Sequence, residues 1–455
     1  MSDSTQGGHA ARTRILLDAP VLPTLFRLAA PNVLGLLVVT VMIGFDGWIL
    51  GRLGPDALAG AALVLPLSML MTQMSAGGMG GAVTAAVARA LGAGRPRDAE
   101  SLAWHALMIA VALATVFTLV LLAAGQRLYA AMGGQGGALE AALAYSDVLF
   151  AGALLTWLAN TFAAIVRGAG NMALPSGTMV AMAFVHLGLC PLLVFGSGGW
   201  AGLGIAGAAV SNLATSTLTI AVLAAWLVRG GGFRRSGIGS RPRRTDFAAI
   251  LRVGAPASLS PVLSNLSVAL VTALVGGYGT AALAGYGIAA RLEYVMVPVA
   301  FGFGTALTAL VATNMGAGQR ERALRATWSG ASVVAGFTGL VGIAAAIQPS
   351  WWMNMFSGDP EVLDFGARYL RVVGASYLMF GLGLALFFAS QGAGRMFWPL
   401  AGSFARVLCV GGVGWLAARV FDAGAEVLFA VVAAGFLLYA LIIAASIRLG
   451  SWARG

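Results

Sequence analysis

The chain has 455 residues, of which 59% are hydrophobic and only 9% are charged, whereas soluble proteins carry about 25% charged residues. Its mean hydropathy of +0.88 excludes a water-soluble globule, which could not bury so much apolar surface, and it also excludes a disordered chain. Because the apolar residues form continuous runs rather than an alternating pattern, the composition indicates a helical membrane protein and not an outer-membrane barrel.

Twelve apolar runs of about twenty residues, the length of a membrane-spanning helix, follow one another along the chain. The expected spans lie near residues 28–50, 57–82, 101–124, 141–166, 173–195, 202–228, 250–275, 281–312, 326–347, 366–389, 398–418 and 427–447. We therefore predict an all-α polytopic membrane protein. Its predicted segments are a cytoplasmic N-terminal segment at 1–26, an N-terminal six-helix bundle at 27–228, a basic cytoplasmic linker at 229–246, a C-terminal six-helix bundle at 247–449 and a cytoplasmic tail at 450–455.

The positive charge is distributed unevenly between the two sides of the expected bundles. All 27 basic residues are arginines, and twenty of them fall in loops or helix ends on one side, against five on the other. Because positive residues stay on the cytoplasmic side during insertion, both termini are predicted to be cytoplasmic in a multi-pass protein of the plasma membrane. The formal charge of +11 is thus a topology signal, and binding to nucleic acid is not predicted.

The two halves of the chain repeat each other at an offset of 224 or 225 residues. The matching segments are RLAAP at 27–31 with RVGAP at 252–256, LGPDALAG at 53–60 with YGTAALAG at 278–285, LGAGRPRDA at 91–99 with MGAGQRERA at 315–323, and RGAGNMALP at 167–175 with QGAGRMFWP at 391–399. Each half has six expected spans, so both halves enter the membrane from the same face. This predicts a parallel repeat related by a pseudo-two-fold axis along the membrane normal, with a substrate route between the bundles.

The same motifs carry a family resemblance. FDGWILGRLGPDALAG, the LGAG loop, RGAGNMALP, GLGIAGAAVSN and MGAGQRERA occur in that order and resemble the multidrug and toxic compound extrusion (MATE) family. The resemblance implies a V-shaped pair of six-helix bundles that exports amphipathic, often cationic, small molecules by alternating access. It further implies a cation-coupled antiporter of the bacterial inner membrane. No obligate protein partner is expected.

Asp46 is the first candidate for coupling transport to an ion. By the repeat offset it corresponds to Val271, so the fold itself does not require an acid at this position. The resemblance implies that Asp46 is the coupling-ion residue, because the family has an acid at this place in its first span. The alternative is an acid near a helix end that is hydrated and paired with a loop. Protonation would remove a charge that is costly inside a membrane.

The fifth span departs from the family pattern. Where related proteins carry Asn-x-x-x-Asp-Pro, this chain has His186, Cys190 and Pro191. Imidazole and thiol are poor ligands for a hard sodium ion, so we expect H⁺ as the coupling ion, with Asn212 of the sixth span as a further member of the coupling site. His186 is expected either to relay protons or to make a structural hydrogen bond. Cys190 is expected to be a small packing residue. No metal site is predicted, because Asp46 and His186 are only two ligands.

Glu293 and four methionines are candidates for substrate binding. Glu293 lies near the middle of its span and corresponds to Ser68 in the other half. It is expected either to attract cationic substrates or carry a second proton, or to be satisfied inside the C-terminal bundle. The methionines suit surfaces that accept many shapes, but they are also ordinary membrane filling. They are Met69, Met71, Met74 and Met296.

Two other transport functions remain open at this point, namely a flippase for lipid-linked sugars or peptidoglycan precursors and a sodium-coupled exporter. A flippase for anionic lipids would be expected to carry several arginines in its central cleft, where only Arg291 is a candidate. The chain has no phosphate-binding loop and no hydrolase motif. Neither an enzyme nor a cofactor is therefore predicted.

Overall fold

The computed structural model describes residues 3–229, 241–421 and 423–452, and this part of the chain folds into helices and short connections with no β-strand. The prediction of an all-α membrane protein is confirmed. Eleven of the described helices are long and apolar enough to cross a membrane. A twelfth span arises when two shorter helices, bent by 50° at a break between them, are counted together. The expected linker at 229–246 lies largely outside the described residues.

The first half of the chain forms the N-terminal lobe. It is preceded by α1 (Asp3–Asp18) and comprises α2 (Val21–Gly51), α3 (Pro55–Thr72), α4 (Gly80–Gly92), α5 (Pro96–Ala131), α6 (Gly136–Ala151), α7 (Ala153–Gly168), α8 (Ala173–Phe195) and α9 (Ile205–Arg229). A π-helical turn, Gln73–Met79, joins α3 to α4 within the second span. The bent pair is α6 and α7.

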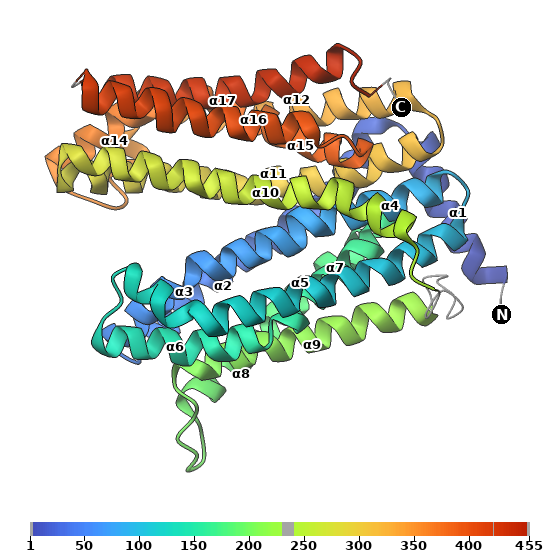
Figure 1. The fold of residues 1–455 in the computed structure, drawn as a ribbon, viewed down its shortest axis with the longest axis horizontal. Helices are drawn as coiled ribbons and strands as arrows, with labels where there is room; N and C mark the ends of the chain where they lie inside the picture. Colours follow the sequence, from blue (N-terminus) through green and yellow to red (C-terminus); the bar gives the residue numbers. More distant parts are fainter. Residues whose placement is uncertain (1–2, 230–240, 422, 453–455) are drawn as a thin grey trace.

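The second half forms the C-terminal lobe. It comprises α10 (Arg244–Val275), α11 (Thr280–Gly316), α12 (Arg320–Ile347), α13 (Ser350–Met353), α14 (Pro360–Val373), α15 (Tyr377–Ala393), α16 (Phe397–Leu408) and α17 (Ala425–Arg448). The helix α16 continues through two π-helical segments, Cys409–Val413 and Leu416–Val420. The ribbons of the two lobes come together at one end of the molecule and diverge toward the other (Figure 1).

The repeat predicted from the sequence is visible in individual hydrogen bonds. In the N-terminal lobe, Thr84 Oγ1 donates to the carbonyl of Ala164 over 3.0 Å. In the C-terminal lobe, Thr308 Oγ1 donates to the carbonyl of Phe388 over 2.9 Å. Both residues of the second pair lie 224 positions after those of the first. The same contact between equivalent spans therefore stabilises each lobe, as a parallel repeat requires.

The end at which the lobes meet, called here the closed end, brings two glycines of the repeat into backbone contact. A Cβ added to Gly92 of α4 would collide with the carbonyl of Thr313, and one added to Gly316 of α11 would collide with the carbonyl of Arg89. Arg89 and Thr313 are themselves repeat mates. The two helix ends therefore cross reciprocally about the pseudo-two-fold axis, at a distance that only glycine permits.

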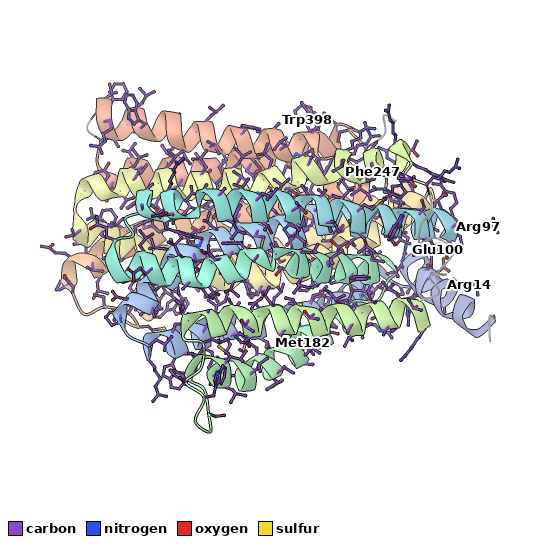
Figure 2. All side chains as sticks on the ribbon, turned by 60° about the horizontal axis from the view of Figure 1, so that its bottom comes forward. Arg14, Arg97, Glu100, Met182, Phe247 and Trp398 are labelled. Atoms are coloured by element: carbon purple, nitrogen blue, oxygen red, sulfur yellow. The ribbon has the colours of Figure 1, made fainter. Side chains whose placement is uncertain are left out.

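The closed end carries arginines of the group that the sequence assigns to the cytoplasmic side. Arg14 of α1 and Arg97 lie there, together with Glu100 (Figure 2). Both chain termini are marked on the same side (Figure 1). The arginines that the sequence grouped on the cytoplasmic side thus include residues that share one end of the structure.

Candidate functional site

Three helices of the N-terminal lobe bring polar side chains together inside an apolar bundle. The ring nitrogen Nε2 of His186, on α8, lies 2.8 Å from Asp46 Oδ1 on α2. The other ring nitrogen, Nδ1, lies 2.9 Å from Ser211 Oγ on α9. When Asp46 is ionised, its carboxylate can only accept, so in that state Nε2–H is the donor. The three residues form one chain of hydrogen bonds that connects α2, α8 and α9.

Cys190, which lies close to Asp46 and His186, belongs to an apolar cluster. The cluster consists of Ile49, Leu50, Ala57, Cys190, Val194, Ile205 and Ala208. The His186 side chain is 9% exposed and the Asp46 side chain 30%, so the histidine is enclosed while the carboxylate keeps one open side. The apolar surroundings screen charge weakly, so the hydrogen bond and the electrostatic attraction between these side chains are stronger here than in water.

The sequence of α8 explains why His186 and Cys190 lie close to each other. They are separated by one helical turn and share a face, and both are buried. Pro191 follows inside the helix and cannot donate a backbone hydrogen bond to the preceding turn. The polar chain therefore sits where the helix is locally weakened, a feature typical of functional sites in membrane helices.

Ser211, and not its neighbour Asn212, contacts His186. Ser211 is fully buried, and Gly207, Ser211 and Thr215 form a buried face of α9 at a spacing of four residues. Asn212 is only half-buried, and its backbone carbonyl accepts a hydrogen bond from Thr215. The hydrogen bond to His186 thus comes from Ser211, and the membership of Asn212 in the coupling site stays a prediction. The helical period of the small buried residues was the signal that could have identified Ser211.

Glu293 occupies a separate polar position in the C-terminal lobe. Its Oε1 accepts hydrogen bonds from the hydroxyl groups of Tyr369 over 3.1 Å and Tyr377 over 3.3 Å. Arg291, two residues away, packs its guanidinium over the ring of Phe356. Glu293 is therefore anchored within the bundle, and Arg291 is not its partner.

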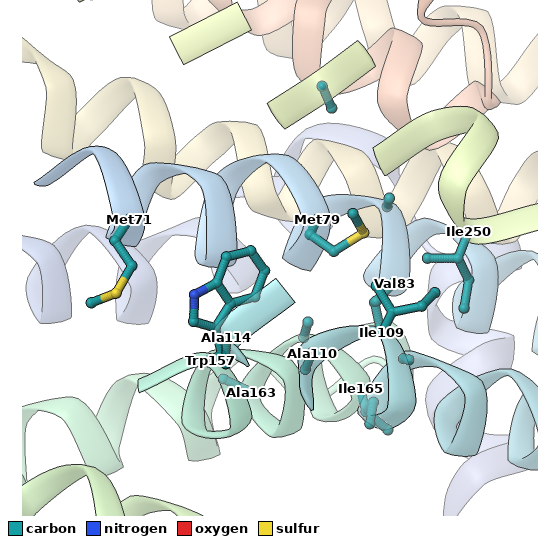
Figure 3. Close-up of a cluster of buried hydrophobic side chains, with 14 of the residues drawn as sticks. Met71, Met79, Val83, Ile109, Ala110, Ala114, Trp157, Ala163, Ile165 and Ile250 are labelled. Atoms are coloured by element: carbon teal, nitrogen blue, oxygen red, sulfur yellow. The ribbon is translucent and has the colours of Figure 1, made fainter. Parts of the chain in front are cut away.

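The methionines do not form one surface. Met71 is buried in the core of the N-terminal lobe with Met79, Trp157 and their neighbours (Figure 3). Met296 is fully buried in the core of the C-terminal lobe. Both side chains are covered by packing in this conformation, and their contact with substrate stays a prediction. Met69 and Met74 are only half-buried.

Cys190 supplies a third potential ligand beside Asp46 and His186. One ligand atom from each residue can be chosen so that all three atoms lie within 4.8 Å of one another. The expectation that this position offers only two ligands is therefore corrected. The sequence places Cys190 on the His186 face of α8, but the approach of Asp46 from α2 depends on how the helices pack.

The fold defines a class, that of membrane transporters built from two parallel six-helix bundles. The MatE family model matches residues 31–192 and 256–416. A FAD transporter of Shewanella oneidensis is 26% identical over 377 residues, which are 82% of each chain. The probable multidrug resistance protein NorM of Mesorhizobium japonicum is 30% identical over 350 residues, which cover 72% of this chain and 71% of that protein.

Solved structures share the fold of this chain. A crystal structure of MATE in complex with MaD3S has a TM-score of 0.86 at 23% identity and covers 97% of this chain and 99% of that chain. A MOP superfamily transporter from Pyrococcus furiosus has a TM-score of 0.87 at 23% identity with the same coverage. The chain belongs to the MATE family of multidrug efflux transporters, and the resemblance read from its motifs is confirmed.

Proposed function

We propose that this protein exports amphipathic, cationic small molecules in exchange for protons, and that Asp46 and His186 hold the coupling proton. The observation that carries the proposal is the 2.8 Å hydrogen bond between these two side chains. By the 224- and 225-residue offsets, their counterparts are Val410 and Val271, both buried and apolar. The repeat therefore needs neither group for packing, and polar pairs inside membrane helices are costly unless they serve a function.

A proton suits this site better than sodium does. A sodium ion needs several oxygen ligands, whereas the position offers one carboxylate, one imidazole and one thiol within reach of one another. An imidazole and a carboxylate can instead hold and release a proton without further ligands. The composition of the site thus supports proton coupling over the sodium-coupled alternative.

The hydrogen-bond chain suggests how a proton moves the helices. In the unloaded state, His186 donates from Nε2 to Asp46 and accepts from the Ser211 hydroxyl at Nδ1. A proton that arrives at Nδ1 turns this nitrogen into a donor, so that Ser211 must rotate its hydroxyl and become the acceptor. Loading therefore changes the contact between α8 and α9 and strengthens the attraction between α8 and α2. These changes bias the packing of the N-terminal lobe.

The proposed cargo rests on the negative charge of Glu293 and on the cargo named for similar proteins. Glu293 is an anion held by two tyrosines, which supports attraction of a cation near the centre of its span. Met69 and Met74 are proposed to contribute an adaptable apolar surface. Two similar proteins differ in their named cargo, since one is a FAD transporter and another a probable multidrug resistance protein. The substrate test therefore compares a cationic dye with a flavin nucleotide.

The proposed location is the bacterial inner membrane with both termini in the cytoplasm. The uneven distribution of arginines supports this orientation. The closed end then faces the cytoplasm, and the lobes diverge toward the outside. The structure would thus correspond to the state that releases cargo.

Transport in everted vesicles tests the proposal. An imposed pH gradient should drive uptake of a cationic dye, a sodium gradient should not, and Asp46→Asn should abolish the pH-driven component. Asp364→Asn is the matched control, because that exposed acid forms only a surface pair with Arg368. Drive by sodium alone would contradict proton coupling. Movement of lipid-linked sugars without dye transport would favour the flippase.

A further inference from the structure

We infer that Asp46, His186 and Cys190 form a binding site for a zinc-like divalent transition metal. The inference goes beyond the proposed function, because metal binding requires neither a proton gradient nor transport. One oxygen, one nitrogen and one sulfur atom converge from α2 and α8, all within 4.8 Å of one another. Mixed ligands of this kind match zinc and its spectroscopic substitute cobalt, and they do not match sodium, magnesium or calcium.

The observed spacing needs little change to hold a metal. With metal–ligand bonds of about 2.0 Å to N and O and about 2.3 Å to S, neighbouring ligands of a tetrahedral site lie about 3.3–3.6 Å apart. The Asp46–His186 pair at 2.8 Å would therefore separate slightly, and the sulfur would approach. Cys190 would bind as a thiolate and release its proton to water. Three protein ligands leave a fourth position for water, on the open side of Asp46.

Ser211 contacts the ring nitrogen of His186 that would not bind the metal. Histidine ligands of metals donate their second ring N–H to a nearby acceptor, which fixes the ring and the tautomer. The Ser211 hydroxyl lies 2.9 Å from Nδ1, on the other side of the ring from Nε2, which contacts Asp46. With Nε2 on the metal, Nδ1–H would donate to Ser211. The ring is thus already oriented for coordination in the absence of a metal.

The apolar neighbourhood favours retention of a bound metal. Cys190 is fully buried and contacts the cluster of Ile49, Val194 and Ala208. The second cysteine, Cys409, lies in the other lobe near the backbone of Val431. No other group of three metal-binding side chains occurs among the described residues. Cys409 therefore serves as an internal control for any thiol-dependent signal.

Cobalt titration of the purified full-length protein in detergent tests the inference. We expect one Co²⁺ per chain, with a thiolate-to-cobalt charge-transfer band and the visible bands of a tetrahedral site, both displaced by Zn²⁺. Cys190→Ser should remove the charge-transfer band and weaken Zn²⁺ binding at least about tenfold. Ser211→Ala should keep the band but weaken binding about 10- to 100-fold, as loss of an outer-shell partner does. Cys409→Ser should change nothing.

Three results would overturn the inference: no charge-transfer band in the wild-type protein, a band that survives Cys190→Ser, or a band lost in Cys409→Ser. Unchanged thermal unfolding of each variant in detergent shows that loss of binding is not loss of folding. Because no gradient is imposed, a negative result leaves proton coupling intact. Equally, failure of pH-driven transport would leave the metal titration interpretable.

Discussion

At the residue scale, Ser211 determines how the imidazole of His186 meets Asp46. The hydroxyl lies within hydrogen-bond distance of Nδ1, so the ring is held with Nε2 toward the carboxylate. A serine hydroxyl both donates and accepts, and it can therefore remain bonded to Nδ1 before and after this nitrogen gains a proton. This residue positions the coupling pair without itself carrying the proton.

Replacing Ser211 by alanine is expected to slow pH-driven transport without abolishing it. One lost hydrogen bond is worth about 0.5–1.5 kcal/mol, which corresponds to a loss of about two- to tenfold. Initial rates of dye uptake at several values of the imposed pH gradient provide the measurement. Ser211→Thr, which keeps the hydroxyl, should restore most of the rate. Equal rates in Ser211→Ala and wild type would contradict the positioning role.

For Glu293, charge and hydrogen bonding can be separated by substitution. A glutamine keeps an oxygen that accepts from Tyr369 and Tyr377 but removes the negative charge. Glu293→Gln is therefore expected to fold normally and to raise the KM for a cationic dye several-fold while leaving the KM for a neutral substrate unchanged. A loss of expression with no change in the relative KM values would instead assign Glu293 a purely structural role.

At the scale of elements, the π-helical turn between α3 and α4 forms part of the lock between the lobes. The fully buried Gln391 of α15 donates from Nε2 to the carbonyl oxygens of Gly77 and Gly78, over 3.0 and 2.9 Å. Wide turns of this kind leave carbonyls without their usual helical partners and are frequent at functional positions. The bond from Arg89 Nη1 to the carbonyl of Gly392, 2.8 Å long, joins the same two lobes nearby.

Gln391→Ala is expected to open the closed end more often. Two buried carbonyls would lose their donor, at a cost of about 1–3 kcal/mol to the closed state. Distances between spin labels at Arg97 and Arg320, both exposed at the closed end, would report the shift, with the native cysteines first replaced by alanine. Gln348→Ala is the control, because Gln348 makes only an exposed hydrogen bond to Ser350. An unchanged distance distribution in Gln391→Ala would contradict the lock.

The close backbone contact between α4 and α11 allows a second, independent test of how the closed end opens. A methyl group at Gly92 would collide with the carbonyl of Thr313, so Gly92→Ala should destabilise the closed arrangement by about 1–3 kcal/mol and lengthen the same label distance. Gly287→Ala on α11 is the matched control, because a Cβ there meets nothing within 4 Å. If both variants behave like wild type, the backbone contact does not limit opening.

At the scale of the whole molecule, hydropathy and the internal repeat were sufficient to predict the fold. Span length is set by the bilayer, and matched motifs related the halves before any contact was known. The repeat comparison singled out Asp46, and the family pattern placed His186 in the same expected coupling site. The contribution of Ser211 could not be predicted, because neighbouring helical residues point about 100° apart and the rotation of α9 is fixed only by packing.

Long-range partners set a second limit on prediction. Tyr369 and Tyr377 lie 76 and 84 residues from Glu293, and nothing in the local pattern connects them. Cys190 does pack in an apolar cluster, as expected, but its approach to Asp46 depends on where α2 crosses α8 and could not be predicted. In a bundle of similar apolar helices, composition determines the spans, whereas side-chain neighbours follow from helix rotation and crossing.

The most direct test of the central claim is proton movement during export. Purified protein is reconstituted in vesicles with an imposed pH gradient and a trapped pH-sensitive dye, and a cationic substrate is then added. Substrate transport is expected to dissipate the gradient in the wild type and in Asp364→Asn but not in Asp46→Asn. Substrate transport that leaves the pH gradient unchanged and requires sodium would contradict proton coupling.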